Sequence, residues 1–131
     1  RNEHIQNKIM PALEQGDWVL SDRFTDSSYA YQGGGRGLDI NRISQLESWV
    51  MQDFTPDMTL LLDVPVEIGM SRVESRGKKD RIEMEKMDFF DRVRQAYIAR
   101  SKEFPDRIKL IDSSKTIEHT TEQIATVLDT L

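Results

Sequence analysis

Apolar residues recur every three or four positions over much of the chain, and polar residues fill the positions between them. This spacing is typical of amphipathic helices. It covers residues 1–16, 40–54, 66–76, 85–103 and 116–131. Pro11 is expected to kink the first of these helices or to mark a boundary in it. Asp39 has the position and the side chain of an N-terminal cap for the second.

Short apolar runs lie between the predicted helices and predict strands over residues 17–22, 57–64 and 107–112. The run at 58–62 is nearly continuous, as in a strand that is covered on both faces. Helices that alternate with such strands indicate an α/β fold, a parallel sheet flanked by helices on both faces. The length of 131 residues fits a single domain, residues 1–131.

Polar residues follow each predicted strand, where open α/β sheets bind their ligands. Asp22 and Arg23 follow the first strand, Asp63 the second, and residues 112–114 the third. An aspartate at a strand end can hold a water bound to Mg²⁺, and an arginine beside it can bind a phosphate through its two-pronged guanidinium. A structural ion pair or a helix cap explains Asp22 and Arg23 equally well on local pattern.

A glycine cluster occupies residues 33–35 and 37, after a predicted short helix over 25–32 that Thr25 or Asp26 would cap. The spacing matches neither a phosphate-binding loop, which needs a lysine after the glycines, nor a dinucleotide fingerprint. We therefore expect a loop with positive φ angles. Gln32 could face a base and Tyr31 a sugar; alternatively, Tyr29 and Tyr31 could serve packing.

Composition excludes several classes of protein. The net charge of −5 argues against a general nucleic-acid binder, and the chain has no cysteine and only two histidines, so neither disulfides nor zinc are expected. No apolar run reaches the roughly 18 residues of a membrane span, and the expected location is the cytoplasm.

The basic run over 72–83 is either a solvated turn or a mobile lid that closes over phosphates.

Four segments together resemble the later part of a bacterial thymidylate kinase (dTMP kinase), a member of the P-loop nucleoside monophosphate kinases. They are IMPALEQGDWVLSDRFTDSSYAYQGGGRG at 9–37, PDMTLLLDVPVEIGMSRVESRGKKDRIE at 56–83, FFDRVRQAYIA at 89–99 and IDSS at 111–114, and the stretch 22–37 is the most specific to the family. The resemblance implies transfer of the γ-phosphoryl group of ATP to dTMP, which gives dTDP for dTTP biosynthesis. It also implies Mg²⁺ as the metal, and a homodimer.

The resemblance also implies a role for individual residues. Arg23 would hold the dTMP phosphate and Asp22 would lie near Mg²⁺ and its water shell. Tyr31 would lie against the deoxyribose and disfavour a 2′-hydroxyl. The thymine side would be formed by Arg1, Ser27, Ser28 and Gln32.

On the donor side, the resemblance places ATP between the predicted lid, residues 72–83, and the end of the third strand. Arg76 and Arg81 would be lid cations that bridge the donor phosphates, and with Arg23 they would carry catalysis. Arg72 would lie near the adenine, and Asp112, Ser113 and Ser114 would line that side of the ATP site.

The sequence departs from the family in one respect, because residues 1–131 contain no phosphate loop. In the family that loop precedes the position of Arg1, and its strand lies between the strands that correspond to 17–22 and 57–64. We therefore expect residues 1–131 alone to fold poorly and to lack activity. Two alternatives stay open: a kinase for another nucleoside or deoxynucleoside monophosphate, and a non-catalytic fragment.

Overall fold

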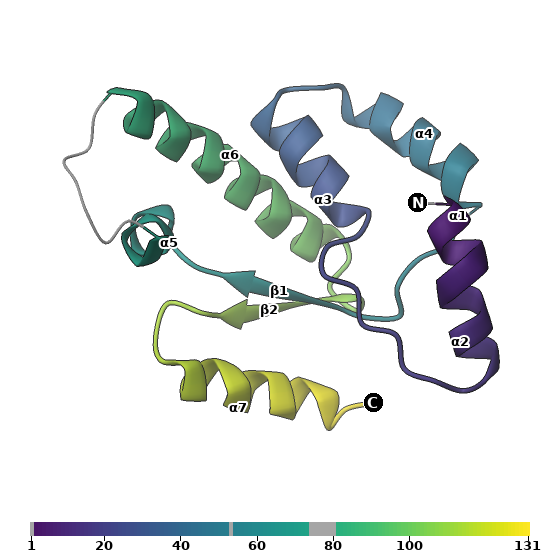
Figure 1. Cartoon of the computed structure of the whole chain (residues 1–131). Coiled ribbons are helices and arrows are strands. Elements are labelled where there is room, and N and C mark those ends of the chain that lie inside the picture. Colours follow the sequence, from purple (N-terminus) through teal and green to yellow (C-terminus); the bar gives the residue numbers. More distant parts are fainter. Residues whose placement is uncertain (1, 53, 74–80) are drawn as a thin grey trace.

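The computed structural model describes residues 2–52, 54–73 and 81–131, with no side-chain placement for residues 81–85. These residues form α-helices, two π-helical segments (η) and two strands (Figure 1). In chain order these are α1 (Asn2–His4), η1 (Ile5–Ile9), α2 (Met10–Glu14), α3 (Asp26–Ser28), η2 (Tyr29–Gly35), α4 (Ile40–Met51), β1 (Thr59–Asp63), α5 (Val66–Val73), α6 (Arg81–Glu103), β2 (Ile108–Asp112) and α7 (Ile117–Leu128).

The sheet is small and parallel. Within the described ranges it consists of β1 and β2, with Thr59 opposite Ile108 and Asp63 opposite Asp112. Helices α6 and α7 lie on opposite sides of these strands (Figure 1). The prediction of a mixed α/β fold with a parallel sheet between helices is confirmed to this extent.

The predicted strand over 17–22 is wrong. Residues 17–21 have no regular structure, and the side chains of Trp18 and Leu20 are 81% and 97% exposed. A β-strand forms only where a neighbouring strand accepts and donates its backbone hydrogen bonds. No strand among the described residues lies in register with this segment, so its apolar side chains have no sheet to cover.

The first helix is continuous from α1 through α2, and Ile5 and Ile9 pack with Met51 of α4 in a buried apolar cluster. Pro11 marks the expected boundary, because the π-helical segment η1 ends directly before α2, whose first turn contains Pro11. Proline has no backbone N–H to donate, so a change of helix type at this position costs little. Asp39 caps α4 as expected, since its Oδ1 accepts from the backbone N–H of Asn41 at 2.9 Å.

The glycine cluster does not form a loop, and that prediction is wrong. Gly33, Gly34 and Gly35 lie inside η2, and of the four clustered glycines Gly37 alone has a positive φ, 71°. The reason for the glycines is close packing against α6. A Cβ on Gly34 would overlap the Cβ of Ala96, and one on Gly35 would come within 2.6 Å of the Phe89 ring.

Replacement of Gly34 by alanine should therefore lower the free energy of unfolding by about 1–3 kcal/mol, the usual cost of overpacking. The added methyl group would also lie 3.0 Å from the Arg92 carbonyl oxygen, which cannot move without bending α6. Urea unfolding measures the change. Gly69→Ala in α5 is the matched control, because its Cβ meets only Val64, at 3.4 Å. Equal stability of the two variants would show that η2 and α6 are not in close contact.

Candidate functional site

Arg23, the predicted phosphate ligand, has an unusual backbone conformation. Its φ is 63°, in the left-handed region that costs a non-glycine residue about 1–2 kcal/mol. Its guanidinium lies 5.1 Å from the centre of the Tyr31 ring, and the side chain is exposed. Such strain persists only where the surrounding structure enforces it, and it is concentrated at functional sites.

Tyr31 and Ser27 are held next to each other by α6. The Tyr31 ring packs against Phe89 and Tyr97, with centroid distances of 6.1 and 6.4 Å. The Tyr97 hydroxyl donates a hydrogen bond of 2.8 Å to Ser27 Oγ. Arg23, Ser27 and Tyr31, which were predicted as dTMP ligands, are thereby brought together, and we call these three residues the acceptor wall.

Two further predicted dTMP ligands lie in the same stretch of helix. Ser28 follows Ser27 in α3, and Gln32 lies in η2. The Gln32 side-chain oxygen accepts a hydrogen bond of 3.2 Å from Arg36, a contact on the protein surface. Arg36 thus contacts the Gln32 amide directly.

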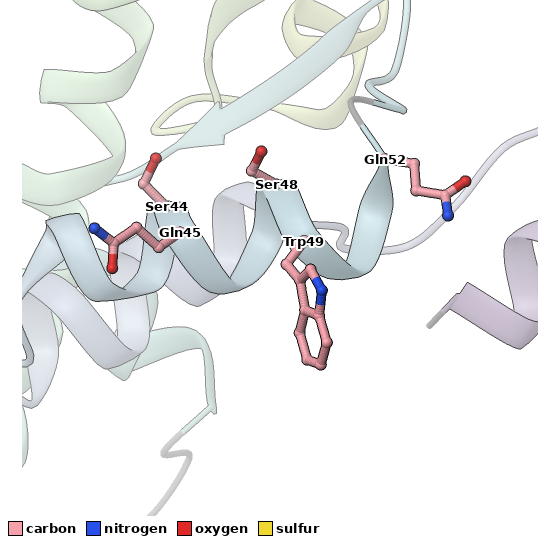
Figure 2. A pocket seen from close by; sticks show the side chains of 5 residues that line it. All are labelled: Ser44, Gln45, Ser48, Trp49 and Gln52. Carbon is pink, nitrogen blue, oxygen red and sulfur yellow. The ribbon is translucent and has the colours of Figure 1, made fainter.

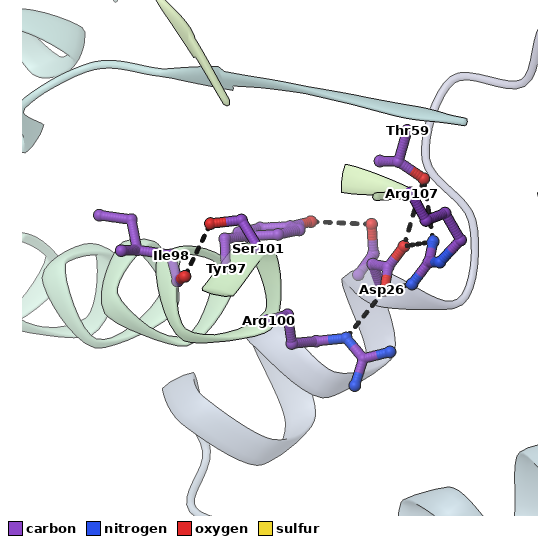
Figure 3. A network of polar contacts seen from close by, with 8 residues as sticks. Asp26, Thr59, Tyr97, Ile98, Arg100, Ser101 and Arg107 are labelled. Carbon is purple, nitrogen blue, oxygen red and sulfur yellow. Dashed lines mark hydrogen bonds and ion pairs between the residues drawn. The ribbon is translucent and has the colours of Figure 1, made fainter. Parts of the chain in front are cut away.

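A buried ion-pair network fixes the helix that carries the acceptor wall (Figure 3). Asp26, only 4% exposed, accepts from Arg100 Nε at 2.8 Å and from both terminal nitrogens of Arg107 at 2.7 and 2.9 Å. Thr59, at the start of β1, accepts from Arg107 Nη1 at 3.0 Å. We call Asp26, Thr59, Arg100 and Arg107 the Asp26 network. It joins α3 to α6, to β1 and to the turn directly before β2.

The structure corrects the expected cap of this short helix. Thr25 occupies the N-cap position but makes no capping hydrogen bond, and Asp26 lies inside the helix with its carboxylate on the two arginines. Burial by itself would raise the pKa of Asp26, but hydrogen bonds and charge from Arg107 and Arg100 outweigh it and hold the pKa below its usual value. The carboxylate is therefore ionised at neutral pH.

The lowered pKa of Asp26 makes the stability of the fold depend on pH. A carboxylate whose folded pKa lies below its unfolded pKa, about 3.9, stabilises the fold fully above that unfolded value. This contribution is lost as the pH falls through the folded pKa. We expect urea unfolding between about pH 6 and pH 3 to show a smaller loss of stability in Asp26→Asn than in the unmodified protein. The exposed Asp57→Asn should keep the unmodified pH dependence, and the same dependence in Asp26→Asn would contradict the assignment.

The predicted ATP ligands also meet in the structure. Arg72, at the end of α5, donates to the carbonyl oxygens of Ser113 at 2.8 Å, Ser114 at 3.1 Å and Lys115 at 3.2 Å. Asp112 Oδ1 accepts from the backbone N–H and the hydroxyl of Ser114, at 2.9 and 2.6 Å. These hydrogen bonds from Ser114 lower the pKa of Asp112. Arg72 therefore orders the loop after β2.

The ends of the two strands meet at one edge of the sheet, as the sequence predicted. Asp63 is opposite Asp112, and Arg94 of α6 donates to both carboxylate oxygens of Asp63, at 2.8 and 2.9 Å. The same Asp63 accepts from the Ser113 N–H through its backbone carbonyl at 2.8 Å. Asp63 is thus a structural anchor that ties β1 to α6.

Several predicted site residues lie outside the described part of the chain. These are Arg1, Arg76 and most of the predicted lid over 72–83, and the side chain of Arg81 is also not described. Asp22, the predicted metal residue, is exposed. Within the described ranges no three His, Cys, Asp or Glu side chains form a metal-binding group. A single carboxylate fits Mg²⁺, which is usually held by one or two carboxylates together with substrate phosphates and water.

Other surface features lie apart from these residues. A hollow beside α4 is lined by Ser44, Gln45, Ser48, Trp49 and Gln52 (Figure 2), and it contains none of the predicted ligands. In the part of the chain that the structure describes, no helix is both long and apolar enough to cross a bilayer.

The sequence could not identify the partners of Asp26 or of the acceptor wall. Arg100 and Arg107 lie 74 and 81 residues after Asp26, and Tyr97 lies 70 residues after Ser27. The one available signal was the density of arginines on the polar face of the predicted helix over 85–103. Basic residues there can pair with acidic residues on neighbouring elements, but the pattern does not say with which.

Comparison of the sequence with known proteins identifies its family. A family model described as thymidylate kinase matches residues 1–124. A thymidylate kinase of Ruthia magnifica subsp. Calyptogena magnifica is 73% identical over 131 residues, which is all of this chain and 64% of the relative. Thymidylate kinases of Vesicomyosocius okutanii subsp. Calyptogena okutanii and Nitrosospira multiformis are 69% and 52% identical, over 100% and 90% of this chain and 64% and 58% of their own lengths.

The chain thus spans about 64% of the length of the first two curated relatives it matches. The family model covers nearly all of residues 1–131, and the match includes both the acceptor wall and the loop after β2. The chain belongs to the thymidylate kinase family.

Proposed function

We propose that this chain is the acceptor-side portion of a dTMP kinase. The longer protein transfers the γ-phosphoryl group of ATP to a phosphate oxygen of dTMP and releases dTDP and ADP. The observation that carries the proposal is Arg23, which is kept in a costly left-handed conformation over Tyr31 in a chain of the thymidylate kinase family.

The acceptor wall suits a nucleoside monophosphate. An exposed guanidinium binds phosphate with two parallel N–H donors, and Arg23 is exposed beside the aromatic face of Tyr31. In our proposal Tyr31 lies against the deoxyribose, and Ser28 and Gln32 reach the thymine edge. Phosphoryl transfer requires little covalent chemistry, so the protein acts mainly by positioning dTMP and neutralising charge.

The donor side follows from the loop after β2. We propose that Asp112, Ser113 and Ser114, with Arg72 behind them, line the adenine side of ATP. Asp22 is the proposed carboxylate for the water shell of Mg²⁺, which would neutralise charge on the phosphates. The phosphate loop is proposed to precede Arg1, as in P-loop nucleoside monophosphate kinases. The lid over 72–83, with Arg76 and Arg81, remains a prediction, and so do a homodimer and a cytoplasmic location.

A coupled ATP-consumption assay on the full-length protein tests this function. With dTMP, dUMP, dCMP and dGMP as acceptors, we expect dTMP to have the highest kcat/KM. The single methyl group that separates dTMP from dUMP should give a preference of about 10-fold or more. Equal use of dTMP and another monophosphate would favour the alternative kinase, and no turnover of any acceptor would favour the non-catalytic fragment.

A further inference from the structure

Tyr97 on α6 contacts two members of the acceptor wall, Ser27 and Tyr31. Its hydroxyl hydrogen-bonds Ser27 Oγ at 2.8 Å, and its ring meets Tyr31 edge-on at 84°. Tyr31 in turn lies beneath the Arg23 guanidinium. A single side chain therefore sets the positions of a hydroxyl and an aromatic ring that face the proposed nucleotide.

The contacts of Tyr97 are specific. Figure 3 shows its hydroxyl directed away from α6 toward the helix that carries Asp26. The phenol is half-buried, and burial is the main cause of its raised pKa, so the hydroxyl stays protonated and donates. With the proton directed to Ser27, the Ser27 oxygen keeps its own O–H free to donate elsewhere, because a hydroxyl offers one donor and two acceptor positions.

We propose that Tyr97 is a positioning residue for the acceptor nucleotide, which fixes Ser27 and Tyr31 so that dTMP binds in one orientation. The inference rests on the proposed function. Tyr97 itself does not contact the nucleotide, so its removal should weaken acceptor binding and leave donor binding unchanged. It differs in this from the Asp26 network, which holds the same helix through ion pairs from Arg100 and Arg107.

The test is Tyr97→Phe in the full-length protein, assayed by steady-state kinetics with dTMP and ATP varied separately. The ring is retained, so the packing on Tyr31 survives and only the hydrogen bond to Ser27 is lost. We expect the KM for dTMP to rise about 3- to 10-fold, the effect of one hydrogen bond. The KM for ATP should stay within about twofold of its original value, and kcat should fall less than the KM for dTMP rises.

Tyr29→Phe is the matched control. Tyr29 lies in η2 as Tyr31 does, but its ring stacks on Arg100 at 3.7 Å and its hydroxyl interacts with Ser44 and Glu47 of α4. Tyr29→Phe removes a phenol hydroxyl, as Tyr97→Phe does, but this hydroxyl contacts α4 and not Ser27. We expect a comparable change in Tm and no selective change in the KM for dTMP.

A double replacement separates positioning from general destabilisation. If Tyr97 acts through Ser27, the effects of Tyr97→Phe and Ser27→Ala on the KM for dTMP should not add. Unchanged KM for dTMP in Tyr97→Phe, or equal rises in the KM for dTMP and ATP, would overturn the inference while leaving the kinase function standing. If the unmodified protein phosphorylates no monophosphate, the proposed function fails and this inference fails with it.

Discussion

Replacement of Asp26 by alanine is expected to lower the free energy of unfolding by about 3–5 kcal/mol. The Asp26 side chain is 6% exposed, and those of Arg100 and Arg107 are 14% and 18% exposed. Without the carboxylate, two largely buried guanidinium groups lose the acceptor that they share. Urea unfolding of the full-length protein measures the loss.

Asp57→Ala is the control for this experiment, because Asp57 is exposed and a surface change of this kind alters stability by no more than about 0.5 kcal/mol. A loss below about 1 kcal/mol in Asp26→Ala would mean that the network behaves as a surface ion pair. The link between α3, α6, β1 and the turn before β2 would then need another explanation.

Replacement of Arg23 by alanine is expected to lower kcat/KM for dTMP by about 100- to 1,000-fold. Loss of one partner of a desolvated, hydrogen-bonded charge pair costs 2–5 kcal/mol, and about 1.4 kcal/mol corresponds to a factor of ten. The kcat/KM of Arg23→Lys should lie between those of the unmodified protein and Arg23→Ala, because lysine restores the charge but not the two parallel donors. The coupled assay measures all three proteins.

Arg42→Ala controls for the loss of one positive charge, since Arg42 is exposed on α4. Its kcat/KM should equal that of the unmodified protein, and circular dichroism should show that both variants keep their helices. A loss of less than about 10-fold in Arg23→Ala would remove Arg23 from the acceptor site and would leave its left-handed backbone unexplained.

The sequence predicted those parts of the site that depend on strand ends. Asp63 and Asp112 each come at the end of an apolar run. Because parallel strands bring their carboxyl ends to one edge of the sheet, both residues were expected at that edge, and the structure pairs them there. The placement of Arg72 on the side of Ser113 and Ser114 was implied by the family resemblance alone, and in the structure Arg72 donates to the carbonyl oxygens of both serines. Local sequence is sufficient for the strand-end predictions because the strand, its end and the polar residue are contiguous.

The errors have one physical cause, which is that local sequence does not show the distant partner. Trp18, Val19 and Leu20 have the composition of a buried strand, but strand formation depends on a neighbour that accepts hydrogen bonds. Gly34 and Gly35 have the composition of a turn, yet Ala96 and Phe89 explain them. Asp26 has the position of a helix cap, but Arg100 and Arg107 determine its role.

The central claim is that the acceptor wall binds dTMP, and a crystal structure of the full-length protein with dTMP tests it most directly. The claim predicts the 5′-phosphate within about 2.7–2.9 Å of the Arg23 guanidinium nitrogens, the distance of a charge-assisted hydrogen bond. It also predicts the deoxyribose against Tyr31 and the thymine edge near Ser28 and Gln32. A dTMP molecule bound elsewhere, with Arg23 still stacked on Tyr31 and open to solvent, would contradict it.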